Sequence, residues 1–307
     1  MKISSEFLYR QMRRFSPLLE KMSVERQRQG QDRLGSVLSA PYRRRVQIDP
    51  ISLPSCPAVW VTPSDGRALW DERSVILYLH GGGYVTGGYP YVSGVAARLC
   101  DRLSLPVLAP VYRLAPEHPY PAALEDALAA WERLLAMGYA PERILLCGES
   151  AGGGLCLALC LSLKAAGRPL PAGQILLSPW VDLTHSGDSI TANADTDPTL
   201  TLSKLEFFAE SYCGCDPEAR KNPLCSPLLG DLSGLSPSLI IAGDAEILAS
   251  DSTRLHEVLL GAGCQSTLRM SPRLWHAYTL YPIAEAEEDF NQMDAFLKKL
   301  SAEWSPL

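Results

Sequence analysis

Short apolar runs alternate with longer stretches of helical period through most of this chain. Six runs have the length of buried strands and are bounded by glycine, proline or polar residues: 75–79, 106–111, 143–147, 174–177, 238–242 and 266–270. Apolar residues between and after these runs recur at helical spacing, near residues 91–103, 121–137, 155–163, 250–262 and 286–304. This alternation predicts an α/β fold whose mostly parallel central sheet is covered by helices on both faces.

The pattern differs at the start of the chain. Residues 2–31 place Phe7, Met12 and Phe15 at helical spacing among arginines, which predicts one amphipathic helix or two. Short alternating runs in residues 45–63, followed by an Asp65-Gly66 turn, predict an opening pair of antiparallel strands. We expect the first helices to form a cap whose charged side faces water.

A second irregular stretch interrupts the strand and helix pattern. Residues 183–235 are rich in Thr, Asp, Pro and Gly, with one short helical stretch near 202–212. An insertion of this size between two core strands is typical of a lid. We therefore divide the chain into N-terminal cap helices at 1–42 and one α/β domain at 43–307, to which 183–235 adds a cap insertion.

Composition and charge narrow the class of partner. The 307 residues are 47% hydrophobic, enough for a large core, and carry a net charge of −6, the wrong sign for binding nucleic acid. Apolar runs do not reach the roughly 18 residues that span a bilayer, and Arg10, Arg13 and Arg14 interrupt any signal-peptide pattern. We expect a cytoplasmic protein that acts on a small molecule.

The nine cysteines show no framework of regular spacing. Cys147 and Cys156 lie in segments predicted to be buried, where a thiol acts as a small hydrophobe. Cys213, Cys215 and Cys225 form a C-x-C cluster without paired histidines, which is a poor zinc pattern. We expect reduced thiols and no metal.

The strongest chemical signal is the pentapeptide from Gly148 to Gly152, Gly-Glu-Ser-Ala-Gly, between a predicted strand and a predicted helix. This context is what a nucleophile elbow requires, because the sharp turn projects the Ser150 hydroxyl out of the sheet. The amides at the start of the helix point toward developing negative charge. Ser150 is therefore the candidate nucleophile.

A run of three glycines follows His80 at the end of the first buried strand. Glycines let backbone amides approach a ligand closely, as an oxyanion hole requires. A phosphate loop is disfavoured because neither Gly-Lys-Ser/Thr nor a ribose-binding acid follows. We expect His80 to hold the backbone of this loop.

A serine nucleophile needs a base and an acid that orients it. Of the five histidines, His276 alone lies in a loop after the last predicted strand, which is the position of the base in α/β hydrolases. The acid should follow the preceding strand, where Asp244, Glu246 and Asp251 are all available. Spacing does not choose among these three.

Four motifs in this order resemble those of the hormone-sensitive lipase family of bacterial carboxylesterases: His80-Gly81-Gly82-Gly83-Tyr84, Tyr112-Arg113-Leu114-Ala115-Pro116-Glu117, Gly148-Glu149-Ser150-Ala151-Gly152-Gly153 and Ser178-Pro179-Trp180-Val181-Asp182. The resemblance covers the chain from about Val75 to its C-terminus. It implies an α/β-hydrolase fold under a helical cap, no cofactor, and hydrolysis of short to medium acyl esters. A homodimer is a further implication.

The resemblance also implies roles for individual residues. Ser150 and His276 match the family's nucleophile and base, and aligning Leu248 with the family's Asp-Pro-Leu stretch places Glu246 at the acid position. The amides of Gly82, Gly83 and Ala151 match the oxyanion donors. The chain departs from the family at Glu149, where aspartate is usual, and at residues 273–275 before the histidine.

Two other functions compete with ester hydrolysis. The same site could hydrolyse an amide or deacetylate an arylacetamide or a sugar. A ligand receptor on this fold would not need the base, so the presence of His276 disfavours that reading.

Overall fold

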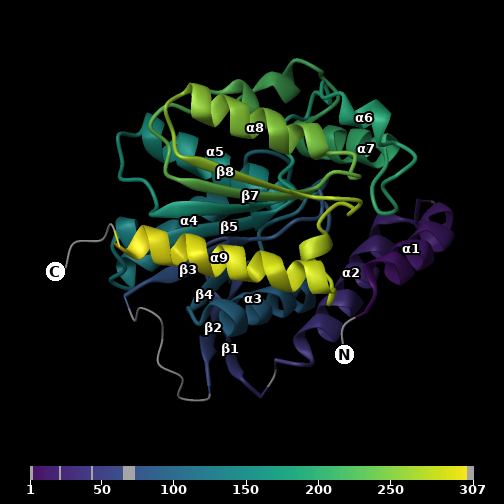
Figure 1. The fold of residues 1–307 in the computed structure, drawn as a ribbon. Coiled ribbons are helices and arrows are strands. Elements are labelled where there is room, and N and C mark those ends of the chain that lie inside the picture. The colour runs from purple at the N-terminus through teal and green to yellow at the C-terminus, as the bar shows by residue number, and fades with distance from the viewer. Residues whose placement is uncertain (1–2, 21, 43, 65–72, 303–307) are drawn as a thin grey trace.

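One eight-stranded sheet organises the computed structural model, which describes residues 3–20, 22–42, 44–64 and 73–302 (Figure 1). In spatial order the strands are β1 (Val46–Ser52), β2 (Pro57–Pro63), β4 (Val107–Pro110), β3 (Val75–Leu79), β5 (Ile144–Glu149), β6 (Gly173–Leu177), β7 (Ser238–Gly243) and β8 (Ser266–Ser271). The β1–β2 and β2–β4 pairs are antiparallel and the other pairs are parallel, which confirms the predicted mostly parallel sheet and its opening antiparallel pair.

Helices cover both faces of this sheet (Figure 1). On one face lie α3 (Tyr89–Leu103) and α9 (Ala284–Ala302), and on the other lie α4 (Ala122–Ala136), α5 (Ala151–Ala165) and α8 (Ala249–Gly261). The buried apolar residues accordingly form two clusters, one on each face. Every residue of β3, β5, β6 and β7 is buried, as expected for parallel strands covered twice.

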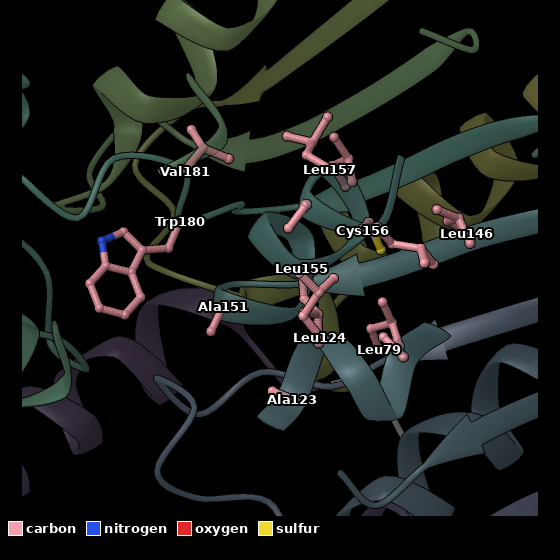
Figure 2. Packing of buried hydrophobic residues seen from close by; sticks show 14 of the residues in the cluster. Leu79, Ala123, Leu124, Leu146, Ala151, Leu155, Cys156, Leu157, Trp180 and Val181 are labelled. Carbon is pink, nitrogen blue, oxygen red and sulfur yellow. The ribbon is translucent and has the colours of Figure 1, made fainter. Parts of the chain in front are cut away.

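Close packing around α5 fixes the position of the central turn. Figure 2 shows Leu155 and Cys156 of α5 together with Leu79 of β3 and Leu146 of β5 in the apolar layer beneath the helix. The thiol of Cys156 is fully buried there, as predicted, and its pKa is raised by burial. The start of α5 is thus anchored directly over the centre of the sheet.

The two segments that we expect to form the cap lie at the same end of the molecule (Figure 1). The first is α1 (Ser5–Glu20) and α2 (Val24–Ser39); the second contains α6 (Ser189–Ala192) and α7 (Leu202–Cys213). Short 3₁₀ turns complete the chain: η1 (Pro141–Arg143), η2 (Ala219–Lys221), η3 (Pro227–Leu229) and η4 (Tyr278–Leu280).

The N-terminal helices differ from the prediction in two ways. Helix α2 continues to Ser39, beyond residue 31, because Gly35 lets it approach α3: a Cβ on Gly35 would lie 2.2 Å from Cα of Tyr91. The apolar side of α1 does not turn wholly inward, since Phe7 and Phe15 are 57% and 51% exposed.

The Asp65-Gly66 turn and Trp304 lie outside the described residues. Within the described ranges, no helix has the length and apolar character to cross a bilayer, and no cluster of His, Cys, Asp and Glu could hold a metal ion. The cytoplasmic location stays a prediction.

Candidate active site

Ser150 lies on the sharp turn between β5 and α5. Its backbone is strained, with φ 53° and ψ −123°, a region that non-glycine residues adopt mainly where the surrounding structure enforces it. The flanking glycines make the turn possible: a Cβ on Gly148 would lie 2.3 Å from the Gly152 oxygen, and a Cβ on Gly152 would lie 2.0 Å from the Leu79 oxygen. The amide of Ser150 donates to the carbonyl of Leu177 at 2.9 Å, which ties the turn to β6.

His276 lies directly beside this serine. It follows β8 in a loop, is 8% exposed, and places Nε2 at 2.9 Å from Ser150 Oγ. Burial lowers the pKa of His276, which favours the neutral imidazole that can accept the hydroxyl proton. His185 and His256 contact Glu206 and Ser266 instead.

The structure separates the three candidate acids. Glu246 is fully buried and its Oε2 lies 3.8 Å from His276 Nδ1. The carboxylate of Asp244 accepts from the amide of Arg273, and that of Asp251 accepts from the amides of Val181 and Asp182. Only Glu246 among the three is therefore brought to the imidazole.

The contact between Glu246 and His276 is longer than a hydrogen bond. Catalytic hydrogen bonds are often loose in free enzymes and shorten when substrate binds. Ser178 Oγ donates to Glu246 Oε2 at 2.6 Å and accepts from the amide of Ala277 at 3.0 Å, so it bridges the two loops. Burial raises the pKa of Glu246 well above its usual value, while the bond from Ser178 opposes this shift.

The glycine loop after β3 borders the same space. Gly82 and Gly83 have φ of 114° and 62°, which glycine adopts without strain. A Cβ on Gly82 would lie 2.4 Å from the Thr86 oxygen, and one on Gly83 would lie 2.3 Å from the ring of Phe208. Only glycines fit here, so the loop can present its backbone amides to a bound group beside the amide of Ala151 at the start of α5.

Two buried side chains hold this loop. His80 contacts the Gly81 carbonyl through Nδ1 at 2.8 Å and stacks on Tyr112, with ring centroids 3.8 Å apart, in agreement with its predicted role. Glu149 accepts from the Gly81 amide at 2.6 Å and from the Tyr91 hydroxyl at 2.8 Å. Burial raises the pKa of Glu149 to about 7, and these hydrogen bonds work against that rise. In the sequence, Glu149 stood out only as a departure from the family. The feature that could have revealed its role in holding the glycine loop is a charged residue in a turn that must be buried.

A cavity of about 180 Å³ joins these groups. Ser150, His276 and the three loop glycines border it, and its walls include Gln31 and Leu34 from α2 as well as Leu205 and Phe208 from α7. Both parts of the cap thus contribute to the cavity. A larger hollow of about 780 Å³ borders Asp244 and Arg273, but neither Ser150 nor His276 lines it.

Together, the sheet order and this cluster define an α/β hydrolase. A family model described as the alpha/beta hydrolase fold matches residues 76–280. The chain is 39% identical to an acetyl-hydrolase of Streptomyces hygroscopicus over 260 residues, which covers 83% of this chain and 84% of that protein. It is 32% identical to an esterase of Acinetobacter venetianus, with 78% of each chain covered.

Solved structures agree with these relatives. An esterase from the bacterial hormone-sensitive lipase family superposes with a TM-score of 0.85 at 32% identity, covering 98% of this chain and 99% of that one. A hormone-sensitive lipase homologue from a metagenome library gives a TM-score of 0.87 at 33% identity, with the same coverage. The chain belongs to the hormone-sensitive lipase family of α/β hydrolases. The fold and family predicted from the motifs are confirmed.

Proposed function

We propose that this protein is a serine carboxylesterase that hydrolyses short to medium acyl esters. The observation that carries the proposal is the 2.9 Å contact between Ser150 Oγ and His276 Nε2 at the wall of a cavity that the glycine loop also borders. A nucleophile, its base and a source of backbone donors around one cavity are the parts that acyl transfer needs. The esterases and acetyl-hydrolases among the relatives support the same activity.

The reaction begins with attack of Ser150 on the ester carbonyl while His276 Nε2 takes the hydroxyl proton. The tetrahedral oxyanion accepts from the amides of Gly82, Gly83 and Ala151, a type of contact worth about 10²–10³-fold in kcat for each donor. The intermediate collapses as His276 returns the proton to the leaving alcohol. Water, activated by the same imidazole, then releases the acid from the serine.

Glu246 is the proposed acid of this triad. Its carboxylate accepts a hydrogen bond from Nδ1–H of His276 during the reaction, which fixes the tautomer and stabilises the imidazolium formed during attack. In the resting site burial raises the pKa of Glu246 and lowers that of His276. At rest the buried carboxylate of Glu246 has no positive partner. When His276 takes the proton of Ser150, the imidazolium becomes that partner, so the pair is stabilised most at this step.

The size of the cavity supports small substrates. About 180 Å³ between α2, α7 and the glycine loop accommodates a short acyl group without displacing the cap. Acetyl esters are among the smallest members of the proposed substrate class, and the relative from Streptomyces hygroscopicus is an acetyl-hydrolase. Comparing p-nitrophenyl acetate with p-nitroacetanilide tests the amidase alternative, which faster turnover of the anilide would favour.

Replacing Ser150 by Ala tests the proposal directly. Loss of the nucleophile should reduce turnover of p-nitrophenyl acetate and butyrate by about 10⁶-fold, while the unfolding temperature changes little because the cavity wall is kept. Covalent labelling by a sulfonyl fluoride should be lost at the same time.

Ser162→Ala on the same helix is the matched control. Its side chain lies three turns along α5 from the site and should leave turnover and labelling unchanged. Undiminished turnover in Ser150→Ala would refute the proposal.

The homodimer also stays a prediction, which light scattering of the purified protein tests.

A further inference from the structure

Asp197 is a buried carboxylate of the cap that the reaction above does not use. It lies between α6 and α7 and is 1% exposed. In the part of the chain that the structure describes, Asp197 forms no ion pair within 4.0 Å. Burying a carboxylate without a cation destabilises the folded protein unless hydrogen bonds from other groups offset the loss of water.

One oxygen of Asp197 organises the wall of the cavity. Oδ1 accepts from the Thr199 amide at 2.9 Å, from the Thr199 hydroxyl at 2.7 Å and from the Leu200 amide at 3.3 Å. Thr199 and Leu200 both border the cavity that contains Ser150 and His276. This oxygen therefore fixes part of the surface that a substrate would contact.

The other oxygen reaches the loop that carries the proposed acid. Oδ2 accepts from the amide of Ile247 at 3.0 Å, next to Glu246. A local turn motif accounts for the bonds to residues 199 and 200. It does not account for a bond to a residue 50 positions away, beside the triad acid.

Neighbouring cap residues strengthen this attachment. Asn193 Nδ2 donates to the Glu246 carbonyl at 2.8 Å, the Thr196 hydroxyl donates to the Ala245 carbonyl at 2.8 Å, and the Ser189 hydroxyl donates to the Ile247 carbonyl at 2.7 Å. The cap is thus hydrogen-bonded to the backbone of three successive residues, 245–247, in the loop that carries Glu246, here called the acid loop. Among these contacts only that of Asp197 carries a charge.

That charge acts on the base. The carboxylate of Asp197 raises the pKa of His276 and opposes the lowering caused by burial, and it also raises the pKa of Glu246. Both effects are those of a negative charge near the imidazole and near the acid. An imidazolium formed during attack is stabilised by the same field.

We propose that Asp197 is a positioning residue through which the cap holds the acid loop and the cavity wall in register and places a carboxylate beside the loop that carries Glu246. The proposal rests on the proposed function, because it assigns Asp197 to the Glu246–His276 pair. It also gives the cap a part in the reaction besides enclosing the substrate.

Asp197→Asn tests this role, since the amide keeps one acceptor oxygen but loses the charge. We expect kcat/KM for p-nitrophenyl butyrate to fall about tenfold to a hundredfold. The negative charge of Asp197 raises the pKa of His276, so its removal should lower that pKa and move the acidic limb of the pH profile of kcat/KM to lower pH. Asp197→Glu keeps the charge and should return the acidic limb of the pH profile to its wild-type position.

Other ionisable groups contact His276 or border the cavity, so the acidic limb of the pH profile must be shown to belong to His276. These groups are Glu246, Glu149, Tyr91 and Tyr281. The titration of His276 followed by NMR of its labelled imidazole separates its pKa from that of Glu149. It also separates two failures: absence of ester turnover in the wild type refutes the proposed function, whereas an unchanged His276 titration in Asp197→Asn refutes the role of Asp197.

Asp182→Asn is the matched control. Asp182 is equally buried and makes the same kind of bonds, to Thr184 and Ser186, but contacts Arg254 rather than the acid loop. A shift of His276 in Asp197→Asn alone supports the proposal. An equal shift in both variants would overturn it. Asp197→Ser, which keeps a hydroxyl acceptor, replaces the Asn variant if that protein does not fold.

Discussion

The central sheet and the cap insertion at residues 183–235 are built in different ways. Strands β3, β5, β6 and β7 are buried at every residue and packed between two helical layers. The cap insertion instead depends on side chains that bind backbone groups, such as those of Asp197 and Ser189. It also depends on stacked rings, such as those of Tyr212 and Tyr84, whose centroids lie 3.7 Å apart. Apolar packing between strands and helices tolerates little change, whereas a set of polar bonds can be altered one at a time.

This difference corresponds to a division of labour. Ser150, Glu246 and His276 all follow strands at the carboxyl edge of the sheet, where a parallel sheet brings distant loops together. The size and shape of the cavity depend on α2 and α7, which belong to the cap. The three proposed catalytic residues therefore follow strands of the sheet, whereas α2 and α7 supply much of the cavity wall, and we expect them to select the acyl group.

Among the substitutions that compare the sheet with the cap, the largest effect should come from the proposed acid that follows β7. Glu246→Gln removes the charge that stabilises the imidazolium but keeps the bond from Ser178, so we expect kcat to fall about 10³–10⁴-fold. Steady-state kinetics with p-nitrophenyl butyrate measures the loss. Asp244→Asn, whose carboxylate contacts the Arg273 amide, should change kcat by less than about threefold. Wild-type turnover in Glu246→Gln would contradict the assignment of Glu246 as the acid.

A smaller effect, on stability alone, should come from the core. Leu146 is fully buried in β5, and its replacement by Ala should reduce the free energy of unfolding by about 2–5 kcal/mol through lost burial and a cavity. Urea denaturation measures this change. The relative kcat/KM for acetate, butyrate and octanoate esters should be unchanged, and altered preference would contradict the separation of sheet and cap.

The smallest effect should come from Phe208 in the cap. Its ring covers Gly83 and borders the cavity, so Phe208→Ala should enlarge the acyl site and raise the octanoate-to-acetate ratio of kcat/KM about tenfold. The loss of stability should be less than for Leu146→Ala, because one side of the Phe208 ring borders the cavity instead of packed side chains. Phe207, its neighbour on α7, is 40% exposed, and Phe207→Ala should leave the ratio unchanged.

Much of the sheet could be predicted because its signal is local. Buried parallel strands are continuous apolar runs, and residues 75–79 match β3 at both ends. The positions of Ser150 and His276 follow from the same pattern, since each lies just after a strand. Spacing left three acids open, and the preference for Glu246 came from the family resemblance; the structure adds the contact with His276.

The cap contacts could not be predicted because they depend on segments far apart in the chain. Asp197 lies in a stretch of Thr, Asp and Pro that reads as a loop, and its importance comes from Ile247, 50 residues later. The extension of α2 depends on Gly35 meeting α3, which no periodicity reveals. Glu149 reads as a conservative replacement until its bonds to Gly81 and Tyr91 are seen.

The walls of the cavity have a practical consequence for protein engineering. Gln31 and Leu34 come from one short segment, and Thr199, Leu200 and Phe208 from another. Neither segment carries the nucleophile, the base or the glycine loop. A library that randomises these two stretches, with Asp197 left unchanged, can therefore search for new selectivities while every clone keeps Ser150, Glu246, His276 and the glycine loop.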